Sequence, residues 1–294
     1  MTVSRIGFVG LGNMGSVLAS NLIGSGFAVM THDVAGPARN PEGAMFVDDV
    51  GDLARVAEVV VLSLPDGAAS EQVAGALAAQ EGRRTSHVVD TSTIGVAAAR
   101  LVESLLTSSD VAYVDAPVSG GVAGARARTL SVMYAGSEPA CAVVEPVLAG
   151  LSDRRRRVGD APGMAQALKL ANNFLSASAL AATSEAVAFG LSLGLDMQVM
   201  LDVLDASSGQ SQATTDKFPN HVLTRRYAAG FANTLMSKDL HLYLSAVEER
   251  GAPSVLGPVT AAAWDRFAAA EPGADFTRIY PFVEGGGDPG SAGC

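Results

Sequence analysis

The feature that most constrains this chain is a glycine pattern close to its start. Gly10, Gly12 and Gly15 follow a short apolar run over residues 5–9 and precede a helical pattern over residues 16–25. In a strand, turn and helix of this kind, the three glycines allow a tight turn, close approach of a pyrophosphate and packing of the helix on the strand. The pattern therefore predicts a βαβ unit that binds a dinucleotide.

Asp33 ends the next expected strand and sets the expected choice of dinucleotide. A carboxylate there can accept hydrogen bonds from both ribose hydroxyls of NAD and would repel the 2′-phosphate of NADP. We therefore expect NAD, although the positive neighbours His32 and Arg39 could soften that discrimination. A methyltransferase also places glycines after its first strand and an acid after its second, so S-adenosylmethionine is the rival ligand.

Alternating patterns predict an α/β fold followed by helices. Apolar, β-branched runs alternate with Ala-rich helical segments, which is typical of a parallel sheet covered on both faces. The expected strands span residues 5–9, 27–32, 58–64, 86–90, 111–115 and 129–135. Beyond Gly163 we expect only helices, over residues 164–193, 196–206, 234–250 and 254–269. The prediction is a Rossmann-type NAD-binding domain (1–162), joined by a long helix to an all-helical substrate and oligomerisation domain (163–283), and a flexible tail (284–294).

Charge and cysteine content exclude several classes of protein. The chain has 294 residues and a formal net charge of −10, whereas a nucleic-acid binder needs a basic footprint. The two cysteines, Cys141 and Cys294, cannot form a disulfide framework, and no signal core follows Met1. We also expect no apolar stretch of the ~18 residues that span a bilayer. These features predict a cytoplasmic protein that contacts neither membrane nor nucleic acid.

Lysine is scarce, which draws attention to its positions. Only Lys169, Lys217 and Lys238 are lysines among 20 basic residues. Lys169 and Asn173 are four residues apart in an expected helix, so an ammonium and a carboxamide share one face. Unlike Arg, a desolvated Lys can lose its proton near neutral pH, so the pair hints at proton transfer. From composition alone, Lys238 is an ordinary surface ion-pair residue and Lys217 lies at the surface.

Other candidate groups are weaker. Ser119, Gly120 and Gly121 follow a strand end and could form a nest of backbone amides for a carboxylate, or a simple turn. Thr93 follows another strand end and could line a nicotinamide. The run over residues 154–157 is all arginine and is expected to be a solvated turn. The four histidines lack metal-ligand spacing, so no metal is expected.

Four motifs in order resemble the β-hydroxyacid dehydrogenase family, which includes 3-hydroxyisobutyrate dehydrogenase, tartronate semialdehyde reductase and L-threonate dehydrogenase. They are the glycine loop over residues 7–15, the loop over 115–121, the helix start over 163–173 and the late lysine motif over 235–240. Together they cover residues 6 to 270. The resemblance implies that this chain transfers a hydride between NAD and a small, anionic 3-hydroxy acid.

The resemblance also assigns roles to residues. It implies that Lys169 is the general acid and base and Asn173 its partner, and that Ser119, Gly120 and Gly121 hold the substrate carboxylate. Contacts with the cofactor are implied for Gly10, Gly12, Asn13, Met14, Gly15, Asp33, Leu64, Pro65, Thr93 and Lys238. A homodimer or homotetramer is implied as well.

Two positions depart from the family pattern, and three alternatives stay open. Ala165 and Arg128 stand where glycines are common, which puts the substrate pocket in doubt more than the reaction. An NADH-dependent semialdehyde reductase, acting on a tartronate or succinic semialdehyde, is the nearest alternative. A non-catalytic NAD-binding regulator and a methyltransferase are the others.

Overall fold

The structure is a computed structural model that describes residues 4–286. The chain divides into two compact units, Met1–Lys169 and Leu170–Cys294. The tail expected over residues 284–294 lies mostly outside the described residues, as does Cys294. Of its described part, Glu284 is the last residue of a helix.

The first unit contains a nine-stranded sheet with the order β3-β2-β1-β4-β5-β6-β8-β7, in which β9 also pairs with β8. Strands β1 to β6 pair in parallel, β8 is antiparallel to β6 and β7, and β9 is parallel to β8. The strands are β1 Arg5–Val9, β2 Ala28–His32, β3 Met45–Phe46, β4 Val59–Leu62, β5 His87–Asp90, β6 Ala112–Asp115, β7 Val118–Ser119, β8 Ser131–Ala135 and β9 Arg154–Gly159. This order confirms the predicted Rossmann-type fold.

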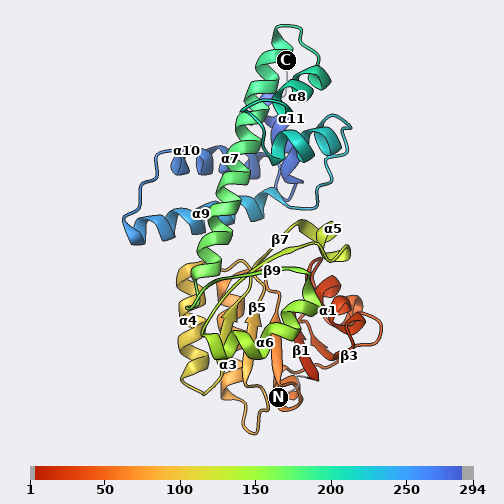
Figure 1. Ribbon diagram of the computed structural model, residues 1–294, viewed down its shortest axis with the longest axis vertical. Helices are drawn as coiled ribbons and strands as arrows, with labels where there is room; N and C mark the ends of the chain where they lie inside the picture. Colours follow the sequence, from red (N-terminus) through yellow and green to blue (C-terminus); the bar gives the residue numbers. More distant parts are fainter. Residues whose placement is uncertain (1–3, 287–294) are drawn as a thin grey trace. The chain divides into compact units, whose positions relative to one another are not determined.

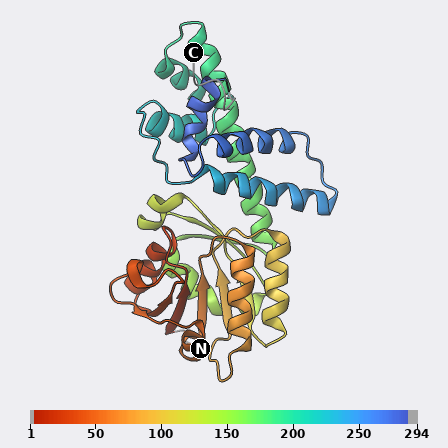
Figure 2. The same cartoon turned by 180° about the vertical axis from the view of Figure 1, so that it is seen from behind.

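Helices cover both faces of this sheet (Figures 1 and 2). The helices are α1 Gly15–Gly24, η1 Pro37–Arg39, α2 Val50–Val56, α3 Gly67–Ala79, α4 Val96–Thr107, α5 Gly121–Arg126 and α6 Glu138–Leu151. One apolar core packs α1 and α6 on the sheet, and a second packs α2, α3 and α4 on the opposite face. Because both faces are covered, every residue of β4 is buried, which explains its unbroken apolar sequence.

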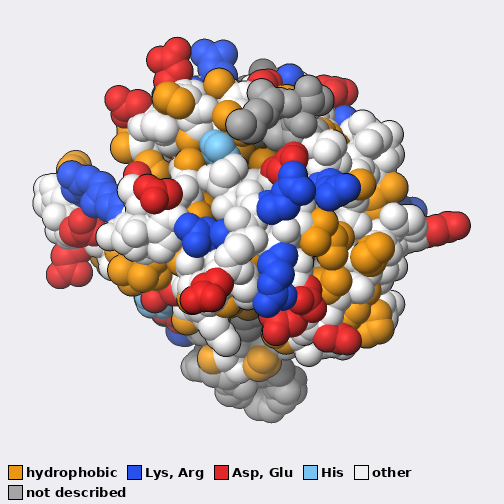
Figure 3. All heavy atoms as spheres, turned by 90° about the horizontal axis from the view of Figure 1, so that it is seen from below, with side chains coloured by type: hydrophobic (Ala, Val, Ile, Leu, Met, Phe, Trp, Pro, Cys, Tyr) orange, Lys and Arg blue, Asp and Glu red, His pale blue; other side chains and the backbone are white. Residues whose placement is uncertain are grey.

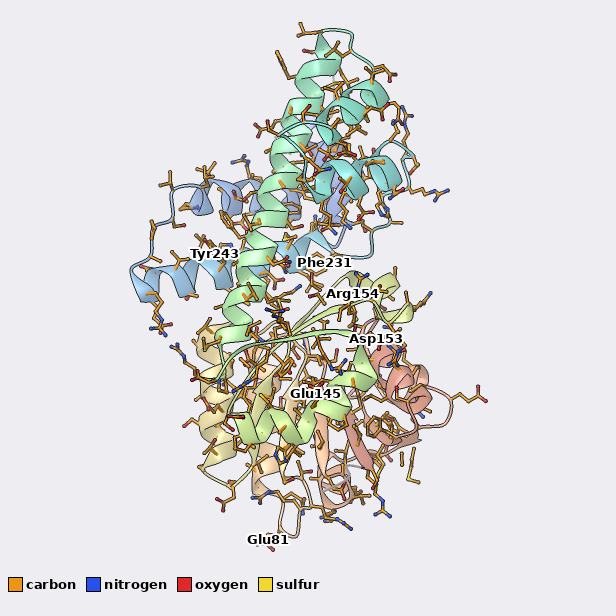
Figure 4. All side chains as sticks on the ribbon, viewed as in Figure 1. Glu81, Glu145, Asp153, Arg154, Phe231 and Tyr243 are labelled. Carbon is orange, nitrogen blue, oxygen red and sulfur yellow. The ribbon has the colours of Figure 1, made fainter. Side chains whose placement is uncertain are left out.

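The arginine run over residues 154–157 is not the solvated turn that we expected. It forms most of β9, at an edge of the sheet beside β8. Arg155 Nε lies 2.6 Å from Oε1 of Glu145 on α6. Glu145 and the neighbouring Arg154 are labelled in Figure 4. Charged side chains are common on edge strands because they oppose pairing with another chain. Because most residues of this strand are charged rather than β-branched, its sequence did not indicate a strand.

The second unit is helical, as predicted. Its helices are α7 Met164–Ser192, whose first turns belong to the first unit, α8 Met197–Asp205, the π-helix η2 Ala213–Val222, α9 Asn233–Arg250, α10 Gly257–Ala270, η3 Phe276–Arg278 and α11 Ile279–Glu284. Its core is aromatic, with Trp264, Phe218 and Phe267 fully buried. The sequence did not predict η2, because Pro219 and its polar neighbours interrupt any helical periodicity.

Helix α7 also corrects one expectation about membranes. By length and composition alone it could span a bilayer, with 33% of its apolar window buried. The expectation that no apolar stretch reaches that length was therefore wrong.

Candidate active site

The glycine loop has the geometry that a dinucleotide requires. A Cβ on Gly10, whose φ is +97°, would lie 2.2 Å from the Ser63 carbonyl oxygen. A Cβ on Gly15 would lie 1.9 Å from the Gly10 carbonyl oxygen, so α1 packs on the loop only without a side chain there. A Cβ on Gly12 would meet nothing within 4 Å. The first and third glycines are thus required by packing, while the second leaves open space beside the start of α1, where a pyrophosphate fits.

Asp33 lies against this loop. Its Oδ2 accepts a hydrogen bond from Leu11 N at 2.5 Å, and its Oδ1 accepts one from Ala35 N at 2.7 Å. Each carboxylate oxygen has two lone pairs, so acceptor capacity remains for ribose hydroxyls. Arg39 Nη1 donates to Asn13 Oδ1 at 2.8 Å, which holds this cation at the exposed rim of the loop. Met14 precedes α1 as its N-cap and packs on the core.

Three of the remaining candidates of the first unit follow the ends of parallel strands, which meet at one edge of the sheet. Leu64 and Pro65 follow β4, and Thr93 follows β5. Ser119 instead lies on β7, which is antiparallel to β8. Leu64 N donates to Ser92 Oγ at 2.8 Å, which ties the first two loops together.

The Ser119 to Gly121 segment has the backbone of a nest. Gly120 and Gly121 have φ values of +130° and +66°, a conformation that only glycine adopts readily. Ser119 ends β7, and Gly121 begins α5. Successive residues of this kind turn their amides toward one point, as a carboxylate cradle needs.

Two buried carboxyl groups end neighbouring strands, and no sequence motif indicated their environment. Asp90 and Asp115 are opposite each other in the pairing of β5 with β6, and both are fully buried. Burial raises the pKa of Asp90, against hydrogen bonds from Ser92. Burial likewise raises the pKa of Asp115 to about 7, although backbone N–H groups of Gln166 and Gly163 act in the opposite direction. The Asp90 charge adds a smaller upward effect.

Lys169 stands on the second turn of α7 and is buried, with 7% of its surface exposed. One turn earlier, Gln166 is fully buried. Gln166 N donates to Asp115 Oδ2 at 2.9 Å, so the carboxyl group caps the start of α7. The sequence alone did not single out Gln166. A polar side chain one turn before Lys169 in an apolar helix could have indicated it.

Asn173 and Lys238 lie in the second unit, where one carboxylate connects them. Asn173 Nδ2 donates to Asp239 Oδ2 at 2.6 Å, and Lys238 Nζ lies 3.3 Å from Asp239 Oδ1. The side chain of Asp239 is 3% exposed, so this is not the solvated surface pair that composition suggested. The ring of Phe174 stacks on that of Tyr243 (labelled in Figure 4) at 4.5 Å between centroids, which joins the same turn of α7 to α9.

The third lysine, Lys217, lies beside an acidic and an aromatic side chain. Lys217 is not simply a surface residue: its side chain is 19% exposed, Nζ lies 2.6 Å from Asp216 Oδ2, and the ammonium lies over the Phe276 ring. On the face drawn in Figure 3, acidic and basic side chains are interspersed. That face offers no single-sign surface of the kind that nucleic acid requires.

Arg128 explains one departure from the family pattern. It has a φ of +57°, which is left-handed and usually favours glycine. Its guanidinium donates to the carbonyl oxygens of Ala149 and Gly150 at 3.0 and 2.9 Å, at the end of α6, and to Ser25 Oγ at 3.0 Å. The side chain thus binds the ends of two helices. The other departure, Ala165, is buried in a small core beside β8.

These features define an α/β protein of the dinucleotide-binding class, in which the ligand binds at the carboxyl ends of parallel strands. Comparisons with known proteins support this class. A sequence model described as the NAD binding domain of 6-phosphogluconate dehydrogenase matches residues 5–159. Another, described as NAD-binding of NADP-dependent 3-hydroxyisobutyrate dehydrogenase, matches residues 163–283.

Individual relatives agree along nearly the whole chain. The 3-hydroxyisobutyrate dehydrogenase of Pseudomonas aeruginosa is 34% identical, with 96% of this chain and 99% of that protein covered. The 2-(hydroxymethyl)glutarate dehydrogenase of Eubacterium barkeri is 33% identical, with 90% and 88% covered. A solved structure of Mycobacterium tuberculosis 3-hydroxyisobutyrate dehydrogenase with L-serine is 32% identical, has a TM-score of 0.87, and covers 96% of this chain and 99% of its own.

The chain belongs to the β-hydroxyacid dehydrogenase family. It is an NAD-dependent hydroxyacid dehydrogenase, an oxidoreductase that acts on CH–OH groups. The predicted family, enzyme class and NAD cofactor are therefore confirmed, and the methyltransferase alternative is wrong.

Proposed function

We propose that this enzyme oxidises a small 3-hydroxy acid resembling 3-hydroxyisobutyrate, with Lys169 as general acid and base. The observation that carries the proposal is the position of this buried lysine, one turn beyond a helix start that is fastened to the ends of β5 and β6. Asn173 follows it by four residues on the same continuous helix. An amine and a carboxamide on one helix face can hold one substrate oxygen between them.

The printed names of relatives support a narrower substrate class. Their names give 3-hydroxyisobutyrate, 2-(hydroxymethyl)glutarate and, as a bound molecule, L-serine. All three carry a CH₂OH group on the carbon next to a carboxylate. We therefore propose that this chain takes acids of the form HOCH₂–CHR–COO⁻ with a small R group.

In this mechanism the protein positions the substrate and moves one proton. The Ser119 to Gly121 segment fixes the carboxylate, and Asn173 orients the reacting oxygen. During oxidation the neutral amine of Lys169 accepts the hydroxyl proton, and during reduction its ammonium donates that proton to the carbonyl oxygen. The bound nicotinamide supplies the hydride acceptor at its C4 atom. Positioning of this kind can contribute several kcal/mol to the rate.

The glycine loop holds the cofactor in the proposal. Gly10 to Gly15 receive the pyrophosphate, Asp33 receives the ribose, and Leu64, Pro65 and Thr93 line the nicotinamide side. The family resemblance adds Lys238 to the proposed cofactor contacts. The open space at Gly12 and the acceptor lone pairs of Asp33 support NAD, and NADP is the weaker ligand because of the Asp33 charge.

We further propose a cytoplasmic homo-oligomer in which residues 1–162 bind NAD and residues 163–283 bind substrate and a second copy. Large apolar side chains stay exposed on α7 and α8, including Phe189, Val199 and Val203 at 67%, 58% and 59%. Such a patch is typical of a protein interface. Light scattering should give a dimer or tetramer mass.

The test is NADH formation with 3-hydroxyisobutyrate, L-serine and 2-(hydroxymethyl)glutarate, with lactate as a 2-hydroxy acid control. We expect activity on at least one of the first three and none on lactate. Lys169→Ala and Lys169→Arg should both lower kcat by about 100-fold or more, because general acid–base catalysis contributes that much. Lys217→Arg is the matched control, and its kcat should equal that of the wild type. Near-normal turnover in Lys169→Arg would show that fixed charge is sufficient.

A semialdehyde reductase makes a different prediction in the same assay. An enzyme working mainly in that direction would consume NADH with tartronate or succinic semialdehyde much faster than it forms NADH. The non-catalytic regulator is excluded, because the relatives show an oxidoreductase that acts on CH–OH groups.

A further inference from the structure

We infer that Gln166 is a positioning residue that holds Lys169 at a fixed position relative to the loops after β4 and β5. The inference rests on the proposed role of Lys169 and adds to it a residue to which neither the resemblance nor the relatives' names assign a role. Gln166 is fully buried, at the first turn of α7. A buried polar side chain costs free energy unless it is hydrogen-bonded, so its partners show what it stabilises.

The carboxamide of Gln166 is bound to a single loop. Its Oε1 accepts hydrogen bonds from Ile94 N at 3.0 Å and Gly95 N at 3.1 Å. Its Nε2 donates to the Ser92 carbonyl oxygen at 2.9 Å. Both lone pairs of the amide oxygen and one amide hydrogen are thus used by the loop that follows β5.

The same loop is tied to the expected cofactor contacts. Ser92 Oγ accepts a hydrogen bond from Leu64 N, and Ser92 N donates to Asp90 Oδ1 at 2.9 Å. Thr93, the proposed nicotinamide neighbour, lies between Ser92 and Ile94, both of which Gln166 binds. Through these bonds, Gln166 connects the start of α7 to the loops after β4 and β5.

Helix geometry carries this connection to the lysine. Lys169 follows Gln166 by three residues, so it lies about 4.5 Å further along the axis on nearly the same face. No flexible joint separates them, because both belong to α7. A shift of the first turn therefore moves the lysine by a similar amount. A misplacement of about 1 Å in a reacting group can cost about 100-fold in rate.

Only glutamine satisfies this loop. A methionine of similar length would leave two N–H groups and one carbonyl group buried without partners. A glutamate could accept from Ile94 N and Gly95 N, but its second oxygen would face the Ser92 carbonyl oxygen and could donate to it only when protonated. The neighbouring carboxyl groups of Asp90 and Asp115 oppose a further negative charge there.

The experiment compares Gln166→Met and Gln166→Glu with a matched control, Thr85→Val, in the full chain. Thr85 is also buried and donates to the Ala54 and Ala57 carbonyl oxygens, but it precedes the opposite end of β5. For each variant we would measure the melting temperature, the dissociation constant for NADH, and kcat and KM with 3-hydroxyisobutyrate from pH 6 to pH 8.

We expect Gln166→Met to lower kcat by about 10-fold to 100-fold while the dissociation constant for NADH changes less than threefold. Thr85→Val should lower the melting temperature without lowering kcat. In Gln166→Glu, the ratio of its kcat to that of the wild type should rise as the pH falls, because the protonated acid restores the bond to Ser92.

The inference is wrong if Gln166→Met keeps kcat within threefold of Thr85→Val. If Gln166→Met does not fold, a pH-independent kcat ratio for Gln166→Glu overturns it instead. Lys169→Ala separates this failure from that of the proposed function. Turnover retained in Lys169→Ala removes the catalytic role of the lysine, whereas loss there with normal Gln166 variants removes only the positioning role.

Discussion

Asp115 makes the enzyme's stability depend on pH, and replacing it with asparagine should remove that dependence. The carboxyl group is buried at the end of β6, and burial raises its pKa from 3.8 to about 7. The folded protein therefore holds a proton that the unfolded chain has lost between these two values. The free energy of unfolding must then fall as the pH rises through this window, and it stays at its lower value above pH 7.

The size of the effect follows from the pKa difference. Each pKa unit corresponds to about 1.4 kcal/mol, so the ionised carboxylate costs about 4 kcal/mol over the full window. About 2 kcal/mol of this falls between pH 5.5 and pH 8. That range also keeps the protein above its isoelectric point of 4.8, where loss of net charge would promote association.

Urea unfolding of wild type and Asp115→Asn at pH 5.5, 7 and 8, at one protein concentration, measures this difference. Asparagine retains an oxygen that can accept from Gln166 N but has no charge to desolvate. Stability of the wild type should decline by about 2 kcal/mol more than that of the variant across this range. If the two stabilities change in parallel with pH, Asp115 does not titrate there and the reasoning is refuted.

Three further predictions concern single contacts. Asp239→Ala should lower kcat/KM by about 10-fold because Asn173 loses its buried partner, and Asp239→Asn should recover part of it by offering an acceptor; equal losses would contradict this role. Arg128→Ala should lower the free energy of unfolding in urea by about 2 kcal/mol, and Arg128→Gly by about 1 kcal/mol less because glycine accepts the left-handed φ; equal losses would mean that the φ is not strained. Asp33→Ala should weaken NAD and strengthen NADP in a fluorescence titration, and an unchanged preference would remove Asp33 from cofactor selection.

The predictable parts of this protein are those whose causes lie within one stretch of chain. The glycine spacing, the strand before it and Asp33 after the next strand form one local unit, so the sequence predicted the fold of residues 5–33. Helical periodicity likewise predicted α7 through α10, with bounds close to those observed. The π-helix η2 and strand β9 were missed because proline and arginine conceal their backbone conformation.

The groups that the sequence could not place depend on contacts between distant residues. Gln166 meets Asp115 across 51 residues of sequence, and Asn173 meets Asp239 across 66. Hydrophobic periodicity cannot predict such pairs, since a period of 2 or 3.6 residues shows only which face of a strand or helix is buried. Arg128 is the sharpest case: its sequence position suggested a changed pocket, but its guanidinium binds the ends of two helices.

The arrangement also suggests why buried acids occur beside a proposed catalytic lysine. Asp115 is costly to ionise, yet its Oδ2 accepts the N–H of Gln166 at the start of the helix that carries Lys169. A helix start has N–H groups without partners inside the helix and a positive dipole end, so a carboxyl group there satisfies an otherwise buried donor. Burying Asp115 therefore costs stability, but its carboxyl group supplies the acceptor that holds the first turn of α7. By this argument Asp115→Asn should gain stability at pH 8 while retaining kcat, because asparagine removes the buried charge and keeps an oxygen that can accept from Gln166 N.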